Sequence, residues 1–177
     1  MSLTVPQRGK ISLVVAPRQV IDIFTEMLAT LAIRGRVIVV DGGNLFDGYG
    51  LARALRKYTP NVEALLRNVQ LSRSFTCYQM LALLKDFPVD GTPVIILDLL
   101  ATFLDESVMF EQRRNLLIES LGQLGKISAH SPVALWVRQR LTPTGDDEKL
   151  LPLVREIAEN YWKVIEPQPL TYQLSLF

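Results

Sequence analysis

The sequence contains few of the residues from which many enzymes build their sites. Its 177 residues include one cysteine, Cys77, and one histidine, His130. A single cysteine cannot form an internal disulfide, and a zinc site of the usual Cys and His ligands is not expected. We therefore predict no metal site and no cofactor. The lone thiol suits a reducing cytoplasm.

Long hydrophobic runs are also missing. The longest, "PVIILDLLATFL", is interrupted by Asp98 and is too short to span a bilayer. The first residues, "MSLTVPQRGK", lack the apolar region of a signal peptide. We expect a cytoplasmic protein without membrane contact. The net charge of +1 neither predicts nor excludes a local surface for nucleic acid.

Short apolar runs alternate with segments of helical spacing. "ISLVVAP", "RVIVVDGG", "TPVIILDLL" and "SPVALWVRQ" are typical of buried strands, and residues 20–34 and 110–128 are typical of helices. This alternation predicts one α/β domain over residues 1–177, with a mostly parallel sheet flanked by helices on both faces. Residues 148–162 predict a helix with Pro152 in its first turn. Residues 161–177 predict a C-terminal β-hairpin.

A phosphate-binding loop is absent as well. The first strand leads into "APRQV", which has neither the glycines nor the Lys-Ser/Thr pair that such a loop requires. Two other strands end in a carboxylate, at Asp41 and at Asp98. Each aspartate is either a relic of a nucleotide or metal site or an ordinary residue that ends a buried strand, and we favour the second reading.

An ordered set of motifs resembles the RecA/RadA-type recombinases. It consists of "DGGNLF", "LSRSF" followed by "YQ", "VIILDLLATF", and the long helix that leads to "VALWVRQ". The likeness covers about residues 10–140 and implies a RecA-like fold. Two features depart from the family: the phosphate loop is missing, and Gly43 aligns with the glutamate that orients the attacking water. The resemblance therefore implies a degenerate, non-enzymatic member.

Arginines occupy the two connections that line single-stranded DNA in that family. Arg113 and Arg114 open the long helix, and Arg138 and Arg140 flank Gln139 at a strand end. The resemblance implies DNA contact at these five residues, since guanidinium groups bind phosphates well. The other reading is that they are ordinary surface charges, offset by nearby acids.

The chain ends in Gln173, Leu174, Ser175, Leu176 and Phe177. This "QLSLF" string resembles the pentapeptide by which bacterial polymerases and repair factors dock on the sliding clamp. Such docking places apolar side chains in a pocket while the glutamine binds its rim. The alternating pattern of the segment equally predicts a terminal strand.

Together these features predict a non-catalytic accessory protein in DNA repair or recombination. It would act through a sliding clamp or another repair protein, through single-stranded DNA, and through homo- or hetero-oligomers with RecA-like proteins; DNA binding would place it at the nucleoid. Two alternatives stay open. One is a structural subunit of a RecA-like ring that acts on RNA, and the other is a relic of an ATPase that binds nucleotide weakly.

Overall fold

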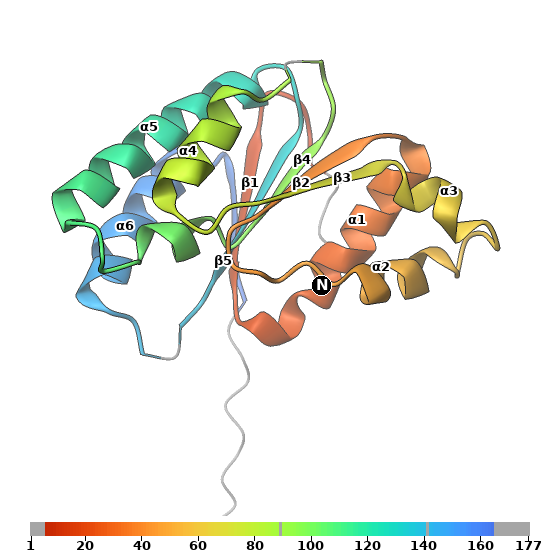
Figure 1. Ribbon diagram of the computed structural model, residues 1–177, viewed down its shortest axis with the longest axis horizontal. Helices are drawn as coiled ribbons and strands as arrows, with labels where there is room; N and C mark the ends of the chain where they lie inside the picture. Colours follow the sequence, from red (N-terminus) through yellow and green to blue (C-terminus); the bar gives the residue numbers. More distant parts are fainter. Residues whose placement is uncertain (1–5, 89, 141, 165–177) are drawn as a thin grey trace, which may run out of the picture.

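The fold is built on one six-stranded parallel sheet (Figure 1). The computed structural model describes residues 6–88, 90–140 and 142–164. The strands are β1 (Ile11–Ala16), β2 (Val37–Asp41), β3 (Val69–Arg73), β4 (Val94–Leu97), β5 (Val133–Arg138) and β6 (Asn160–Lys163). The helices are α1 (Asp22–Arg34), α2 (Gly48–Leu55), α3 (Val62–Leu66), α4 (Cys77–Lys85), α5 (Phe110–Ser128) and α6 (Gly145–Glu156), with two 3-10 turns, η1 (Arg18–Val20) and η2 (Leu99–Phe103).

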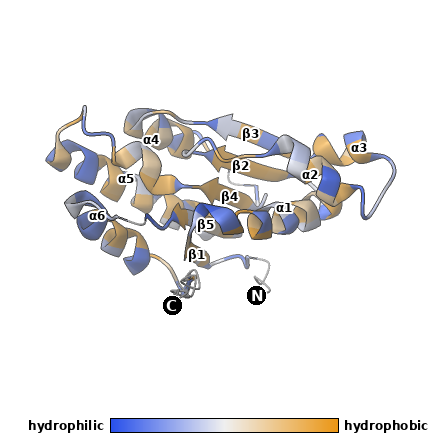
Figure 2. Cartoon of the chain, turned by 90° about the horizontal axis from the view of Figure 1, so that it is seen from below, coloured by the Kyte–Doolittle hydropathy of each residue, from blue (hydrophilic) through white to orange (hydrophobic). Residues whose placement is uncertain are grey.

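The strand order is β3-β2-β4-β5-β1-β6, and every pair is parallel. The central strands are apolar on both faces because helices cover both sides of the sheet. Edge strand β3 is only half-buried. Figure 2 shows this difference, with β2 and β4 orange and β3 paler and more hydrophilic.

Two apolar layers hold the helices against the sheet. One joins α4, α5 and α6 to the sheet through residues such as Phe103 and Leu117. The other joins α1, α2 and α3 through residues such as Phe24 and Trp136. Figure 1 shows these two groups of helices on opposite sides of the strands. Each fully buried large apolar side chain contributes about 1.5–3 kcal/mol, so both layers stabilise the fold.

The predicted α/β class and the parallel sheet are confirmed, and the sheet is wholly parallel in the described part of the chain. Cys77 and Trp136 lie in the core. The prediction for α6 is wrong at both ends: the helix begins at Gly145, so Pro152 lies inside it, and it ends at Glu156. Thr144 and Asp147 form a capping box that starts the helix earlier. The first predicted hairpin strand is β6, and the second lies outside the described residues.

Chain connections diverge at two places along the carboxyl edge of the sheet. The connection after β2 leads outward to β3, whereas the connection after its neighbour β4 leads the other way to β5. The neighbours β5 and β1 also connect in opposite directions, β5 to β6 through α6 and β1 to β2 through α1, and these two helices lie on opposite faces of the sheet. In open parallel sheets such points leave a crevice at the strand ends, where ligands bind. Asp41 and Asp98 lie at the first point, and Arg138 lies at the second.

Candidate functional site

Asp41, at the end of β2, holds the following loop. Its Oδ1 accepts from the main-chain N–H of Gly43 and Leu45, at 3.2 and 3.0 Å, and its Oδ2 accepts from Leu45 and Phe46, at 2.9 Å each. Arg73 Nε from β3 lies 3.7 Å from Oδ2. The side chain is fully buried. Because its acceptor positions are occupied by the chain itself, Asp41 serves the structure of the loop.

Asp98, at the end of β4, is buried in an unusual backbone conformation. Its φ of 53° lies in the left-handed region, which aspartate tolerates better than most residues. Its Oδ1 accepts from the main-chain N–H of Arg138 at 3.1 Å. Its Oδ2 lies 3.2 Å from Arg138 Nε, without the alignment of a hydrogen bond. The carboxylate is thus held mainly by one neighbour on β5.

Two opposing influences act on the pKa of Asp98. Burial raises the pKa of this carboxyl above its ordinary value. The Arg138 N–H and the guanidinium groups of Arg138 and Arg140 lower it, and the charge of Asp41 raises it again. Burial is the largest cause, so the net direction is upward. Part of the stability of the site therefore depends on Arg138.

The glycine pair after β2 lets the ends of β2 and β4 approach closely. A Cβ added at Gly43 would lie 2.6 Å from Cβ and 2.8 Å from Oδ2 of Asp98. A Cβ at Gly42 would lie 2.9 Å from the carbonyl oxygen of Asp98. Neither glycine has a positive φ. Close packing, rather than turn geometry, therefore requires glycine at both positions.

An open cleft of about 520 Å³ lies at the second point of divergence, between the ends of β1 and β5. Arg138, Gln139 and Arg140 line it on one side, and Arg18 and Gln19 line it on the other. Arg140 Nε lies 3.5 Å from Asp147. The Oε1 of Gln139 is buried and has no hydrogen-bond partner among the described residues. The cleft is thus lined by cationic groups, whereas the unpaired acceptor of Gln139 is closed to solvent.

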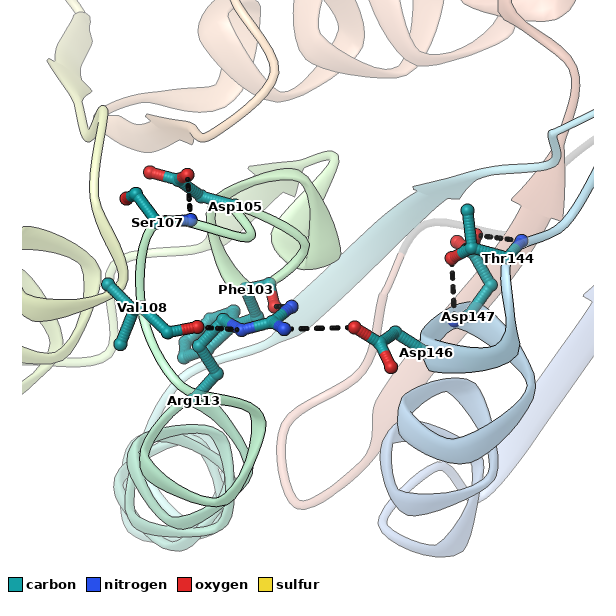
Figure 3. Close-up of polar contacts among 8 residues, drawn as sticks. All are labelled: Phe103, Asp105, Ser107, Val108, Arg113, Thr144, Asp146 and Asp147. Atoms are coloured by element: carbon teal, nitrogen blue, oxygen red, sulfur yellow. Dashed lines mark hydrogen bonds and ion pairs between the residues drawn. The ribbon is translucent and has the colours of Figure 1, made fainter.

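Arg113 is a buried structural residue, in contrast to its expected role at a DNA surface. Only 4% of its side chain is exposed. Figure 3 shows its guanidinium between α5 and α6, where it donates to the carbonyls of Val108 and Phe103 and to Asp146, at 2.8, 3.0 and 2.9 Å. Because these bonds occupy the guanidinium, Arg113 does not reach a ligand at the surface.

The remaining sequence candidates lie apart from this network. Arg114 is half-buried on α5, next to Arg113 in the chain. Residues Gln173, Leu174, Ser175, Leu176 and Phe177 lie outside the described residues. The structure therefore brings together Asp41, Asp98 and Arg138 along one edge, and it places Gln139 and Arg140 beside them. Arg114 joins neither group of contacts.

Sequence reasoning missed two residues of this edge. Arg73 lies against Asp41, and Arg18 lines the cleft. Arg73 is the last residue of β3, and Arg18 lies two residues after β1, so nearness to a strand end is the signal that would have found them. Within the described ranges, no cluster of three or more potential metal ligands occurs. No helix in those ranges has the length and apolar character needed to cross a membrane.

No protein-family model matches this chain, and no curated protein is significantly similar to it. The two carboxylates at the strand ends are engaged by the chain, and the cations beside them lie next to acids.

Proposed function

We propose that this chain is a non-catalytic, RecA-like accessory protein of DNA repair or recombination, which acts by contact rather than by nucleotide hydrolysis. The observation that carries the proposal is the state of Asp98. Its carboxylate accepts from the Arg138 main chain and faces the Arg138 guanidinium. A metal ion at Asp98 would have to displace this cation, and no lysine or phosphate loop would help to hold the nucleotide.

Gly43 supports the same conclusion. In the resemblance to recombinases, this position aligns with the glutamate that orients the attacking water. Any side chain at 43 would meet Asp98 at 2.6 Å, so the packing leaves no room for a carboxylate there. The close contact between the ends of β2 and β4 therefore supports the proposal that no catalytic glutamate stands at position 43.

The proposed partners are a sliding clamp or another repair protein, and RecA-like proteins with which the chain forms oligomers. Residues 173–177 are the proposed docking peptide for the clamp. Single-stranded DNA is a further proposed ligand. Arg114, Arg138 and Arg140 stay candidates for that contact, although Arg138 and Arg140 each lie against an acid.

Hydrolysis assays test the proposed lack of catalysis. The purified protein is expected to release no phosphate from Mg-ATP above the level of a matched Asp98→Asn variant. Asparagine tolerates the left-handed conformation and still accepts a hydrogen bond from residue 138, so this variant is expected to fold. Turnover by the wild type that the Asp98→Asn substitution abolishes would contradict the proposal.

The cleft between β1 and β5 favours one second candidate, a relic site that binds nucleotide without hydrolysis. Arg18 and Arg140 would face the phosphates of the nucleotide. A rise in melting temperature with Mg-ATP, lost in an Arg18→Gln variant, would favour it. An unchanged melting temperature at millimolar Mg-ATP would exclude it.

A further inference from the structure

The charges of this protein are divided between the two edges of its sheet. At the carboxyl edge, four arginines each lie against an aspartate: Arg73, Arg113, Arg138 and Arg140. Two others at that edge, Arg18 and Arg114, have no ion pair among the described residues. The amino edge, where the strands begin, carries a different set of cations. We call it the basic edge, and it consists of Arg8, Lys10, Arg34, Arg67 and Lys126.

The residues of the basic edge are exposed, and none of them lies within ion-pair distance of an acid in the part of the chain that the structure describes. Arg8 and Lys10 precede β1, Arg34 and Arg67 precede β2 and β3, and Lys126 closes α5 before β5. With neighbouring strands about 4.8 Å apart, the four spacings between the five strands from β3 to β1 cover roughly 19 Å.

Contacts connect these separate loops. Arg8 Nε donates to the carbonyl of Ala129 at 3.3 Å, and Gly9 N donates to Ser128 at 2.8 Å, so the segment before β1 lies against the end of α5. Pro6, Arg34, Arg36 and Pro132 border one open depression of about 430 Å³. The loops before β1, β2, β4 and β5 therefore border one depression, whose lining includes Arg34 from the basic edge and Asp90 from the loop before β4.

Helix dipoles account for part of this distribution. Arg34 and Lys126 lie in the last turns of α1 and α5, where cations stabilise a helix. Asp22, Glu111 and Asp146 lie in first turns at the other edge. Helix dipoles do not account for Arg8 and Lys10, because these residues precede a strand. The side chains of Arg34 and Lys126 are still exposed to solvent and free to bind a ligand. Two acids at this edge oppose the trend. Asp90 lies 3.8 Å from Arg36, which we leave out of the basic edge, and Glu159 Oε2 accepts from the main-chain N–H of Ile11 at 2.6 Å.

We propose that the basic edge binds the phosphate backbone of a nucleic-acid strand. Unpaired, exposed cations spread across several loops suit a repeating row of phosphates, whereas a protein partner would be expected to bring an apolar centre. DNA and RNA share this backbone, so the surface alone does not choose between them. The inference rests on the proposed function only in that both have the protein bind nucleic acid. It assigns the binding surface to the basic edge instead of to Arg138 and Arg140.

The test is fluorescence anisotropy with the full chain and labelled single-stranded oligonucleotides, one of deoxythymidine and one of uridine. If five phosphates are neutralised, the affinity is expected to fall about a hundredfold between about 50 and 200 mM salt. The triple variant Lys10→Gln, Arg34→Gln, Arg67→Gln is expected to bind weakly and to lose less than about tenfold over that range. A preference for either polymer supports the proposal and identifies the natural strand.

Two further variants make the result specific. Arg53→Gln, Arg56→Gln, Lys163→Gln removes the same charge elsewhere and is expected to bind as the wild type does. A second triple variant, Arg18→Gln, Arg114→Gln, Arg140→Gln, removes three positive charges from the carboxyl edge. Loss of binding in this last variant with retention in the basic-edge variant would overturn the proposal, and so would no binding by the wild type at low salt. Circular dichroism confirms that each variant is folded.

A measurement of binding to the sliding clamp distinguishes failure of this inference from failure of the proposed function. The basic-edge variant is expected to bind the clamp as the wild type does, because residues 173–177 are unchanged. A protein that binds the clamp but neither oligonucleotide would overturn the basic edge alone. A protein that binds oligonucleotides through the basic edge but never the clamp would overturn the docking peptide alone.

Discussion

The pair formed by Asp98 and Arg138 is expected to control the stability of the carboxyl edge. Removal of one partner of a buried ion pair costs about 3–5 kcal/mol. Here the Arg138 side chain is 32% exposed and the Asp98 side chain is 4% exposed. Water screens the arginine, and the main-chain N–H of residue 138 still donates to Asp98 after substitution. We therefore expect Arg138→Ala to lower the free energy of unfolding by roughly 1–3 kcal/mol at pH 7.

The loss is expected to depend on pH in a definite direction. The pKa of Asp98 is raised in the folded state above its ordinary value of 3.8, and loss of the Arg138 guanidinium raises it further. A raised carboxyl pKa means that the folded state binds the proton more tightly, so stability from this group falls as pH rises through the folded pKa. The deficit of Arg138→Ala should therefore shrink as pH falls toward 3.8.

A double-mutant cycle measures this coupling. Urea unfolding is followed for the wild type, Arg138→Ala, Asp98→Asn and the double variant at pH 7 and near pH 4.5. In the Asp98→Asn background, Arg138→Ala is expected to cost less than about 0.5 kcal/mol, because no buried charge is left unpaired. An equal cost in both backgrounds at pH 7 would refute the coupling and with it the account of Asp98.

Three further predictions follow from the same edge. Gly43→Ala should destabilise the protein by about 1–3 kcal/mol, because the new methyl group would overlap Asp98. Gly122→Ala, in open space on α5, should stabilise the protein by about 0.5–1 kcal/mol. Equal effects of the two variants in thermal unfolding would contradict the packing argument. Arg113→Met should cost about 2–4 kcal/mol because it leaves two buried carbonyls and Asp146 unpaired, and Arg114→Met should change urea unfolding by less than about 0.5 kcal/mol. Asp41→Asn should cost about 1–3 kcal/mol, since an amide cannot accept all the loop N–H bonds; unchanged hydrogen exchange at Leu45 and Phe46 would argue against this role.

Periodicity and strand-end residues made much of the fold predictable. The long helix was predicted at residues 110–128, where α5 lies, because apolar spacing marks both of its ends. The start of α6 was predicted too late because proline is usually found in the first turn of a helix, and Pro152 was placed there. The capping box of Thr144 and Asp147 instead starts the helix at Gly145. Local hydrogen bonds thus outweigh a single unfavourable residue.

The sequence predicted where the residues of the candidate site lie, but it did not predict what they contact. Asp41 and Asp98 were found because each ends an apolar run. The sequence does not reveal that Asp98 meets Arg138, since these residues are 40 positions apart and only the pairing of β4 with β5 brings them together. Arg113 looked like a surface charge, and its burial depends on carbonyls of a loop and on Asp146 from another helix.

Binding to a bacterial sliding clamp tests the proposed function most directly. We would measure the affinity of the full chain, of a chain truncated before Gln173, and of a full-length Leu176→Ala, Phe177→Ala variant that keeps the length of the segment. The account predicts that the full chain binds and that both altered forms lose at least tenfold in affinity. Equal binding by all three forms, or no binding by the full chain, would contradict a role for residues 173–177 in clamp docking.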